Sequence, residues 1–203
     1  MPNYAFHKMQ ALGNDFILID AREEADARER AFDLSPERIA HWSDRHTGIG
    51  CDQWLIIEPP RHSNSLASYR IFNADGSTAE QCLNGLRCIV WYLAHREQQA
   101  EMVLDGPTNI VQAKVTSTLA ERQQKAMVEL ELAPPRLGSD AVAWQDQLGT
   151  ESKPTESFPI RLDSASLEAT GVNMGNPHAV IFVTDARQSR ARYGVKVSTH
   201  EQF

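Results

Sequence analysis

The stretch from residue 72 to residue 88, FNADGSTAEQCLNGLRC, holds the side chains best suited to chemistry in this chain of 203 residues. Its central feature is Cys82, which stands where a segment with helically spaced apolar residues begins. A thiol at a helix start faces unpaired backbone N–H groups and the positive end of the helix dipole, which together stabilise a thiolate. The same N–H groups can hold a carboxylate or a phosphate. We therefore predict a proton-accepting thiolate and an anion site at one place.

The cysteines also have an ordinary structural explanation. A single cysteine is more often a small buried hydrophobe than a catalytic group, and both interpretations stay open for Cys82 on its position alone. Cys88 lies further along the same segment, about 240° around a helix of 3.6 residues per turn, so we expect it to pack in the core. For Cys51, beside Gly50 and Asp52, we expect packing at the start of a strand.

Three asparagines and one histidine are further candidates. Asn14, Asn73 and Asn176 each stand beside a turn or strand end, where a turn-forming role competes with ligand binding. Asn14 and Asn176 both follow a glycine and precede an apolar run, which forms an internal echo that chance could also produce. For His178 we expect a structural hydrogen bond, with a general base as the alternative.

The elements that position these residues follow from apolar periodicity. Ser35 and Pro36 predict a helix start, and a second, amphipathic helix is predicted over 84–95 from the spacing of Leu86, Ile89, Val90 and Leu93. Apolar or alternating runs predict strands at 16–19, 54–57, 68–72, 102–104, 110–115, 127–132, 160–162 and 179–183. Strands with only two helices and no regular alternation indicate an α+β fold.

Length and composition set the domain organisation. At about 150 residues per domain, 203 residues suit one large domain or one domain and part of a second. A stretch rich in proline, glycine and serine begins at Pro134 and is followed by polar sequence as far as Pro159. We therefore predict domains at 1–133 and 134–203.

Charge and hydropathy exclude several classes of protein. Asp and Glu outnumber Lys and Arg by 27 to 20, and the lysines are scattered, so we expect no nucleic-acid partner. The longest apolar run, 88–94, is too short for a membrane span, and the chain begins without a signal-peptide pattern. We expect a cytoplasmic protein. The three cysteines form no CxxC pair, which argues against a disulfide framework and against a zinc or other metal site.

Five motifs, taken together, resemble those of the diaminopimelate epimerase family in order and spacing. They are LGNDF at 12–16, TGIG with DQ at 47–53, FNADGS at 72–77, QC with NG and RC at 81–88, and MGNPH at 174–178. The resemblance implies two pseudo-symmetric α+β domains, each a curled, mostly antiparallel sheet around a central helix. It also implies an isomerase that interconverts LL- and meso-2,6-diaminopimelate for lysine and peptidoglycan synthesis, without pyridoxal phosphate or any other cofactor.

The resemblance further implies how the site works. One cysteine from each domain flanks the substrate α-carbon, one removing a proton and the other delivering one. By match, Cys82 is the catalytic cysteine of the N-terminal domain, and the substrate-binding positions are Asn14, Gln53, Asn73, Leu83, Asn84 and Asn176. Leu83 and Leu86 stand where the family usually has glycine and alanine. At Leu83 the side chain would crowd the substrate carboxylate or point outward, with the backbone N–H still available.

The second half of the motif pattern is incomplete. The spacing from Asn14 to Cys82, applied to Asn176, projects a partner cysteine beyond Phe203. We therefore expect a C-terminally truncated family member, with apolar sheet surface left uncovered and a homodimer as one result. The alternatives are a non-catalytic remnant and a related racemase that acts on another amino acid.

Overall fold

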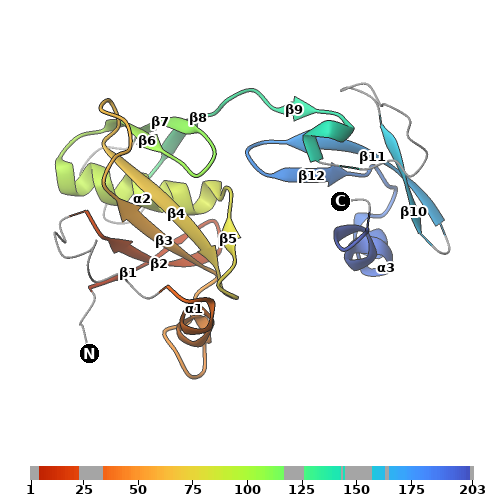
Figure 1. Cartoon of the computed structure of the whole chain (residues 1–203), viewed down its shortest axis with the longest axis horizontal. Helices are drawn as coiled ribbons and strands as arrows, with labels where there is room; N and C mark the ends of the chain where they lie inside the picture. The colour runs from red at the N-terminus through yellow and green to blue at the C-terminus, as the bar shows by residue number, and fades with distance from the viewer. Residues whose placement is uncertain are drawn as a thin grey trace. The chain divides into compact units, whose positions relative to one another are not determined.

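The computed structural model of the chain describes residues 5–22, 34–116, 126–142, 144, 157–162 and 165–201. It divides into two compact units, unit 1 (Met1–Leu132) and unit 2 (Ala133–Phe203). Figure 1 shows that sheet and helix occur in both units, and the α+β class is confirmed. No helix among the described residues is long and apolar enough to cross a membrane.

Unit 1 is built on one curled, mixed sheet. Its strands run in the order β1-β2-β3-β4-β6-β7-β8, with β5 paired to β4. The pairs β2/β3 and β4/β6 are parallel, and the other pairs are antiparallel. The strands are β1 (His7–Ala11), β2 (Asn14–Asp20), β3 (Gln53–Glu58), β4 (Ala67–Asn73), β5 (Thr78–Ala79), β6 (Glu101–Asp105), β7 (Ile110–Val115) and β8 (Val128–Glu131).

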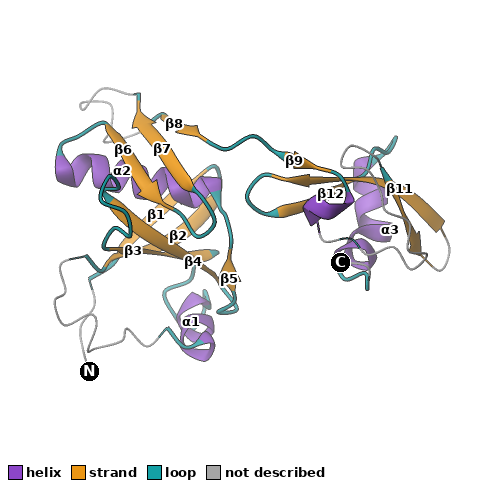
Figure 2. Cartoon of the chain, turned by 45° about the horizontal axis from the view of Figure 1, so that its top comes forward, coloured by secondary structure: helices purple, strands orange, loops and turns teal. Residues whose placement is uncertain are grey.

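The two helices described in unit 1 lie on opposite faces of this sheet (Figure 2). The amphipathic helix α2 (Leu83–Glu97) fills the hollow of the curl and buries Leu86, Ile89 and Leu93 in the main core. The short helix α1 (Pro36–Ser43) covers the other face, where Ile39 packs with Trp54. Because the central strands β2 and β3 are covered on both faces, their apolar runs are continuous rather than alternating.

Local signals explain where these helices begin. The side chain of Ser35 accepts a hydrogen bond from the Arg38 backbone N–H, which confirms the predicted start of α1. The start of α2 lies tightly against the sheet at Gly85, where an added Cβ would come within 2.7 Å of Leu55 Cδ2. A glycine therefore brings the beginning of α2 close to the ends of the central strands.

In its described residues, unit 2 is a smaller antiparallel sheet with one 3₁₀ helix and one α-helix. Its strands run in the order β10-β11-β12, and β9 pairs with β11. A small core contains Val142, Phe158, Ile160 and Ala169. The elements are β9 (Arg136–Leu137), the 3₁₀ helix η3 (Ser139–Val142), β10 (Phe158–Leu162), β11 (Ala165–Asn173), β12 (Pro177–Val180) and α3 (Ala186–Ser198).

Several elements differ from the sequence-based expectation. The strand predicted at 179–183 is partly wrong, since β12 runs from Pro177 to Val180 and 181–183 are not strand. The expectation of only two helices was also wrong, because the chain forms a third helix, α3. This helix buries none of its residues, so its sequence has no apolar stripe that would predict it. Its capping signal is local, since Asp185 accepts a hydrogen bond from the Gln188 N–H.

The internal echo corresponds to a shared local structure. Gly13, with φ of 92°, turns the chain between the antiparallel strands β1 and β2. Gly175, with φ of 111°, does the same between β11 and β12. In each hairpin a glycine of left-handed φ thus lies in the turn, directly before the asparagine, and this φ explains the glycine.

Candidate active site

Cys82 is the N-cap residue of α2, as the sequence predicts. Its side chain is half-buried, and Sγ accepts a hydrogen bond from the Gly85 backbone N–H at 3.4 Å. The Leu86 N–H bonds to the Cys82 carbonyl oxygen. The first turn of a helix leaves its remaining N–H groups without intrahelical partners. Those of Leu83 and Asn84 are therefore placed to hold an anion beside the thiol.

Three strands bring predicted amide side chains to one edge of the sheet. Asn14 begins β2, Gln53 begins the parallel strand β3, and Asn73 ends β4, where it pairs with Gln53 in register. Gln53 Nε2 donates to Asn73 Oδ1 at 2.9 Å. Asn84 Nδ2 donates to Asn14 Oδ1 at 2.7 Å, which joins the start of α2 to this edge.

A group of charged residues supports the same edge from outside. Arg45 donates to Asp15 Oδ1 at 2.6 Å and to Asp52 Oδ1 at 2.8 Å, and Lys8 pairs with Asp15 at 2.5 Å. Asp52 Oδ2 accepts from Asn14 Nδ2 at 3.2 Å. The hydrogen bonds from Arg45 outweigh the effect of burial and, with Lys8, hold the pKa of Asp15 well below its usual range. This edge therefore stays charged and ion-paired at neutral pH.

Sequence reasoning did not select these supporting residues. Asp15, Asp52, Asp75 and Ser77 lie inside the quoted motifs, so their position beside the candidate amides was available as a signal. Arg45 lies outside every motif, and its approach to the site follows from the turn after α1, which only the folded chain defines.

The other two cysteines are packing residues, as predicted. Cys51 is 3% exposed and Cys88 is 4% exposed. Burial raises the pKa of Cys88 to about 12 and also raises that of Cys51. Both thiols are therefore protonated and shielded at neutral pH.

Alkylation should separate the three thiols. In the native chain we expect iodoacetamide to modify Cys82 first, because Cys51 and Cys88 are buried and held as thiols. Mass spectrometry should find one adduct per native chain and three in denaturant. Equal labelling rates for Cys82 and Cys88 in the native chain would contradict this arrangement.

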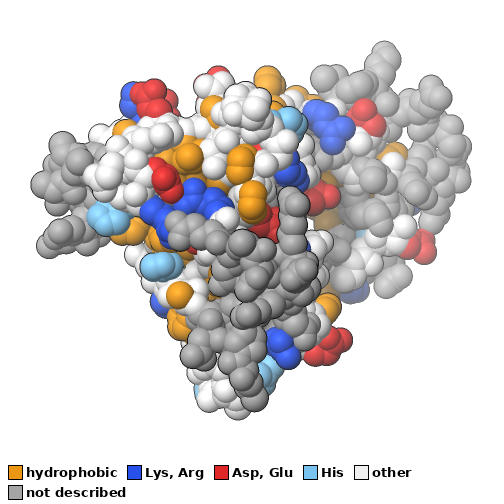
Figure 3. All heavy atoms as spheres, turned by 60° about the vertical axis from the view of Figure 1, so that its left-hand side comes forward, with side chains coloured by type: hydrophobic (Ala, Val, Ile, Leu, Met, Phe, Trp, Pro, Cys, Tyr) orange, Lys and Arg blue, Asp and Glu red, His pale blue; other side chains and the backbone are white. Residues whose placement is uncertain are grey.

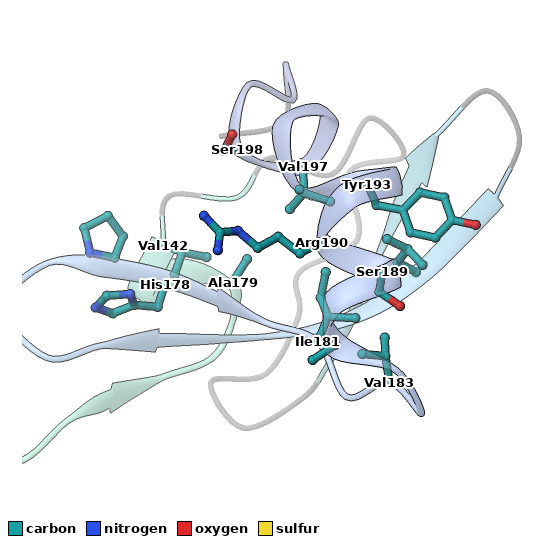
Figure 4. A pocket seen from close by; sticks show the side chains of 14 residues that line it. Val142, His178, Ala179, Ile181, Val183, Ser189, Arg190, Tyr193, Val197 and Ser198 are labelled. Atoms are coloured by element: carbon teal, nitrogen blue, oxygen red, sulfur yellow. The ribbon is translucent and has the colours of Figure 1, made fainter.

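The remaining predicted residue, Asn176, lies in unit 2, in the turn before β12. Its Oδ1 accepts a hydrogen bond from His178 Nε2 at 2.9 Å, so the histidine has the structural bond expected of it. A cavity of about 600 Å³ lies nearby, between the sheet of unit 2 and α3. Figure 4 shows apolar side chains such as Ile181 and Val197 lining it, with Arg190 reaching over the sheet from α3. Among the described residues that line the cavity there is no thiol or carboxylate, and its titratable side chains are His178, Arg190 and Tyr193.

Basic side chains in unit 1 are distributed among acidic partners. Arg70 pairs with Glu58 at 2.6 Å, and Lys114 pairs with Glu101 at 2.5 Å. On the face shown in Figure 3, lysine and arginine side chains stand in small groups among acidic and apolar ones. Each of these ion pairs is exposed and contributes little to stability.

Two solved structures share the fold. A hydroxyproline epimerase from Agrobacterium vitis, with bound trans-4-hydroxy-L-proline, has a TM-score of 0.62 and 10% identity, covering 94% of this chain and 56% of that chain. A probable proline racemase from Agrobacterium radiobacter has a TM-score of 0.64 and 11% identity, covering 95% and 57%. At this identity the likeness shows the fold alone.

Sequence comparison gives the family. The family model described as diaminopimelate epimerase matches residues 6–128. The diaminopimelate epimerase of Halorhodospira halophila is 37% identical over 201 residues, covering 98% of this chain and 64% of that protein. That of Thioalkalivibrio sulfidiphilus is 36% identical over 204 residues, covering 98% and 66%. The chain thus spans 64–66% of the length of these relatives. On this match, which includes the motifs around Cys82, the chain belongs to the diaminopimelate epimerase family.

Proposed function

We propose that the chain acts on diaminopimelate, with Cys82 as the acid/base thiol on one face of the α-carbon and with no metal or cofactor. The observation that carries this proposal is the half-buried Cys82 thiol at the start of α2, where Asn84 contacts Asn14 on the sheet edge. Membership of the family supports diaminopimelate as the substrate. The substrate is a small molecule with an ammonium and a carboxylate on the reacting carbon.

The proposed chemistry is removal of the α-proton by the Cys82 thiolate. As the C–H bond breaks, its electron pair moves toward the carboxylate, which becomes enediolate-like. The N–H groups of Leu83 and Asn84 stabilise this charge because they are already oriented before the reaction. The thiol then returns a proton to carbon, which completes an exchange. Asn14, Gln53 and Asn73 supply polar contacts to the rest of the substrate. For Asn176, family resemblance alone supports a role in substrate binding.

Inversion needs a second acid on the opposite face of the α-carbon. The chain has three cysteines, and two of them are buried in unit 1. With Cys82 as the accessible thiol, the chemistry expected of this chain is exchange of the α-proton with retention of configuration. The family reaction, by comparison, uses one thiol on each face.

Proton exchange in deuterated water tests the proposal. The chain is incubated with LL-diaminopimelate, loss of the α-proton signal is followed by NMR, and the stereoisomers are separated afterwards. Exchange with retention is the expected result, and exchange with formation of the meso isomer would also support the family activity. Absence of exchange with an intact Cys82 thiol would reject catalysis. Faster exchange of L-lysine than of diaminopimelate would instead favour a racemase with another substrate.

The remaining parts of the proposal concern organisation. We propose that the domains of the family correspond here to 1–133 and 134–203, and that the chain works in the cytoplasm, where thiols stay reduced. We also propose a homodimer. It is supported by apolar side chains of unit 2 that face solvent, with Phe182 90% and Val195 77% exposed. Sedimentation velocity distinguishes this dimer from a monomer.

A further inference from the structure

Two chains of hydrogen bonds lead from a carboxylate to the amide side chains of the site. The first, the Asp52 relay, consists of Asp52, Asn14 and Asn84. The second, the Asp75 relay, consists of Asp75, Ser77, Asn73 and Gln53. Both lie at the edge where β2 and β3 begin and β4 ends.

The Asp52 relay fixes the orientation of two amides. A carboxylate can only accept hydrogen bonds, so Asn14 must turn its NH₂ group toward Asp52 Oδ2, at 3.2 Å. This leaves Asn14 Oδ1 to accept from Asn84 Nδ2 at 2.7 Å. The carboxylate itself is held by Arg45 on Oδ1 and by the Asp15 backbone N–H on Oδ2. Both oxygens of Asp52 are therefore in use.

The Asp75 relay works in the same way through a hydroxyl group. Asp75 Oδ1 accepts from Ser77 Oγ at 2.6 Å and from the Ser77 backbone N–H at 2.9 Å. Because the hydroxyl hydrogen of Ser77 is used in the bond to Asp75, Ser77 Oγ accepts a hydrogen bond from Asn73 Nδ2 at 2.9 Å. Asn73 Oδ1 then accepts from Gln53 Nε2 at 2.9 Å. This relay uses only one oxygen of Asp75.

Each relay ends on a carboxamide oxygen. Within the described part of the chain, no hydrogen bond is made to Asn84 Oδ1 or to Gln53 Oε1. These two oxygens are acceptors, and the substrate class of the proposed function carries an ammonium, which can only donate. If the hydrogen bonds of either relay ran in the opposite direction, an NH₂ group would take the place of the terminal carboxamide oxygen. That NH₂ group would repel the ammonium.

We propose that Asp52 and Asp75 are positioning residues that set the polarity of these amides, so that the site presents oxygen acceptors to the ammonium of the substrate. This inference rests on the proposed function. Neither carboxylate needs to touch the substrate. Each acts through the amides, and the N–H groups at the start of α2 receive the carboxylate end independently.

Replacement of Asp52 by asparagine is the sharpest test. Because both carboxylate oxygens are used, Asp52→Asn must place an NH₂ group against either Asn14, which reverses the relay, or Arg45, which leaves Asn14 on a neutral and weaker acceptor. We expect the side-chain NH₂ signals of Asn14 and Asn84 to shift in the NMR spectrum of the ¹⁵N-labelled chain, while those of Asn73 and Gln53 stay in place. For Asp75→Ala we expect the opposite pattern.

Ligand selectivity separates positioning from a merely structural role. Titration with LL-diaminopimelate should show about tenfold weaker binding by Asp52→Asn and by Asp75→Ala. Pimelate, which has the carboxylates but no ammonium, should bind the variants and the wild type within about twofold. Asp140→Asn, an exposed change in unit 2, is the matched control.

A double substitution provides the rescue. When Asn14→Asp is combined with Asp52→Asn, the new carboxylate at position 14 accepts from both neighbours, and Asn84 regains its orientation. We expect the double variant to bind LL-diaminopimelate more tightly than Asp52→Asn alone. Loss of pimelate binding in parallel with loss of diaminopimelate binding would overturn the positioning role.

The two proposals fail differently. If wild-type chain binds no diaminopimelate, the proposed function fails, and the NH₂ signals still decide whether the relays orient the amides. If Asp52→Asn leaves the signals of Asn14 and Asn84 unchanged, the Asp52 relay is wrong even when the chain is active.

Discussion

Cys82→Ala is expected to lower the rate of α-proton exchange from LL-diaminopimelate about 10³-fold or more, because it removes the proposed base from the site. The fold should survive, since the side chain contributes one long N-cap hydrogen bond to Gly85 and is only half-buried. The exchange rate is measured by NMR in deuterated water, and the free energy of unfolding by urea titration.

Cys82→Ser separates the roles of this residue as cap and as base. Serine is among the preferred N-cap residues, so α2 should be as stable as in the wild type or more stable. A hydroxyl group is a far weaker acid than a thiol, and exchange should be lost as completely as in Cys82→Ala. Exchange retained by Cys82→Ser would remove the thiol from the mechanism.

Cys88→Ala is the matched control on the same helix. Its side chain is 4% exposed in the core, so this variant should lose about 1 kcal/mol of unfolding free energy through the cavity it leaves. Exchange should stay within about twofold of wild type, because Cys88 faces the core rather than the helix start. A similar loss of exchange in both variants would indicate that Cys82→Ala lowers the exchange rate by destabilising α2.

Local signals made one half of the site predictable. The N-cap at Cys82, the periodicity of α2 and the end of β4 at Asn73 each depend on residues within one or two helical turns or one strand. If another face of α2 were turned to the sheet, Leu86 and Leu93 would be exposed together, so the spacing of these residues specifies which face is buried. The substrate-binding roles came instead from family resemblance and stay predictions; they concern Asn14, Gln53, Asn73, Leu83, Asn84 and Asn176.

Long-range contacts explain what the sequence could not predict. β1 is an edge strand with mostly exposed side chains, so its apolar content gave no signal. β11 is a strand in which the backbone at Gly171 lies close to the backbone at Gly138, and apolar periodicity does not indicate this contact. An added Cβ at Gly171 would lie 2.0 Å from the Gly138 carbonyl oxygen. Arg45 reaches Asp15 across 30 positions of sequence. Such contacts exist only once distant segments have met.

The buried carboxylate of Asp105 was another feature that sequence alone did not reveal. Asp105 ends β6 and is 1% exposed. It accepts hydrogen bonds from Ser65 Oγ at 2.7 Å, from His62 Nδ1 at 2.8 Å and from the backbone N–H of Arg61 at 2.7 Å. Burial alone would raise the pKa of Asp105, but these hydrogen bonds outweigh it and hold the pKa well below its usual range. One side chain thus fixes the connection between β3 and β4.

Asp105→Ala should therefore destabilise the chain by about 3 kcal/mol, because it leaves the buried Ser65 hydroxyl and nearby N–H groups without an acceptor. Asp105→Asn keeps one acceptor oxygen and should lose less. The free energy of unfolding is measured by urea titration at pH 7. Adding Ser65→Ala to Asp105→Ala should cost less than the sum of the single changes, since both remove the same bond.

The dependence on pH has a definite sign. The folded-state pKa of Asp105 lies below the unfolded value of about 3.9, so its contribution is complete above about pH 5. As the pH falls below about 4, the unfolded chain takes up the proton first, and the stabilisation declines toward the folded-state pKa. The difference between wild type and Asp105→Ala should therefore narrow between pH 5 and pH 3, on the order of 1 kcal/mol or more. A difference that stays constant over this range would show that packing, rather than the ionised carboxylate, holds the connection in place.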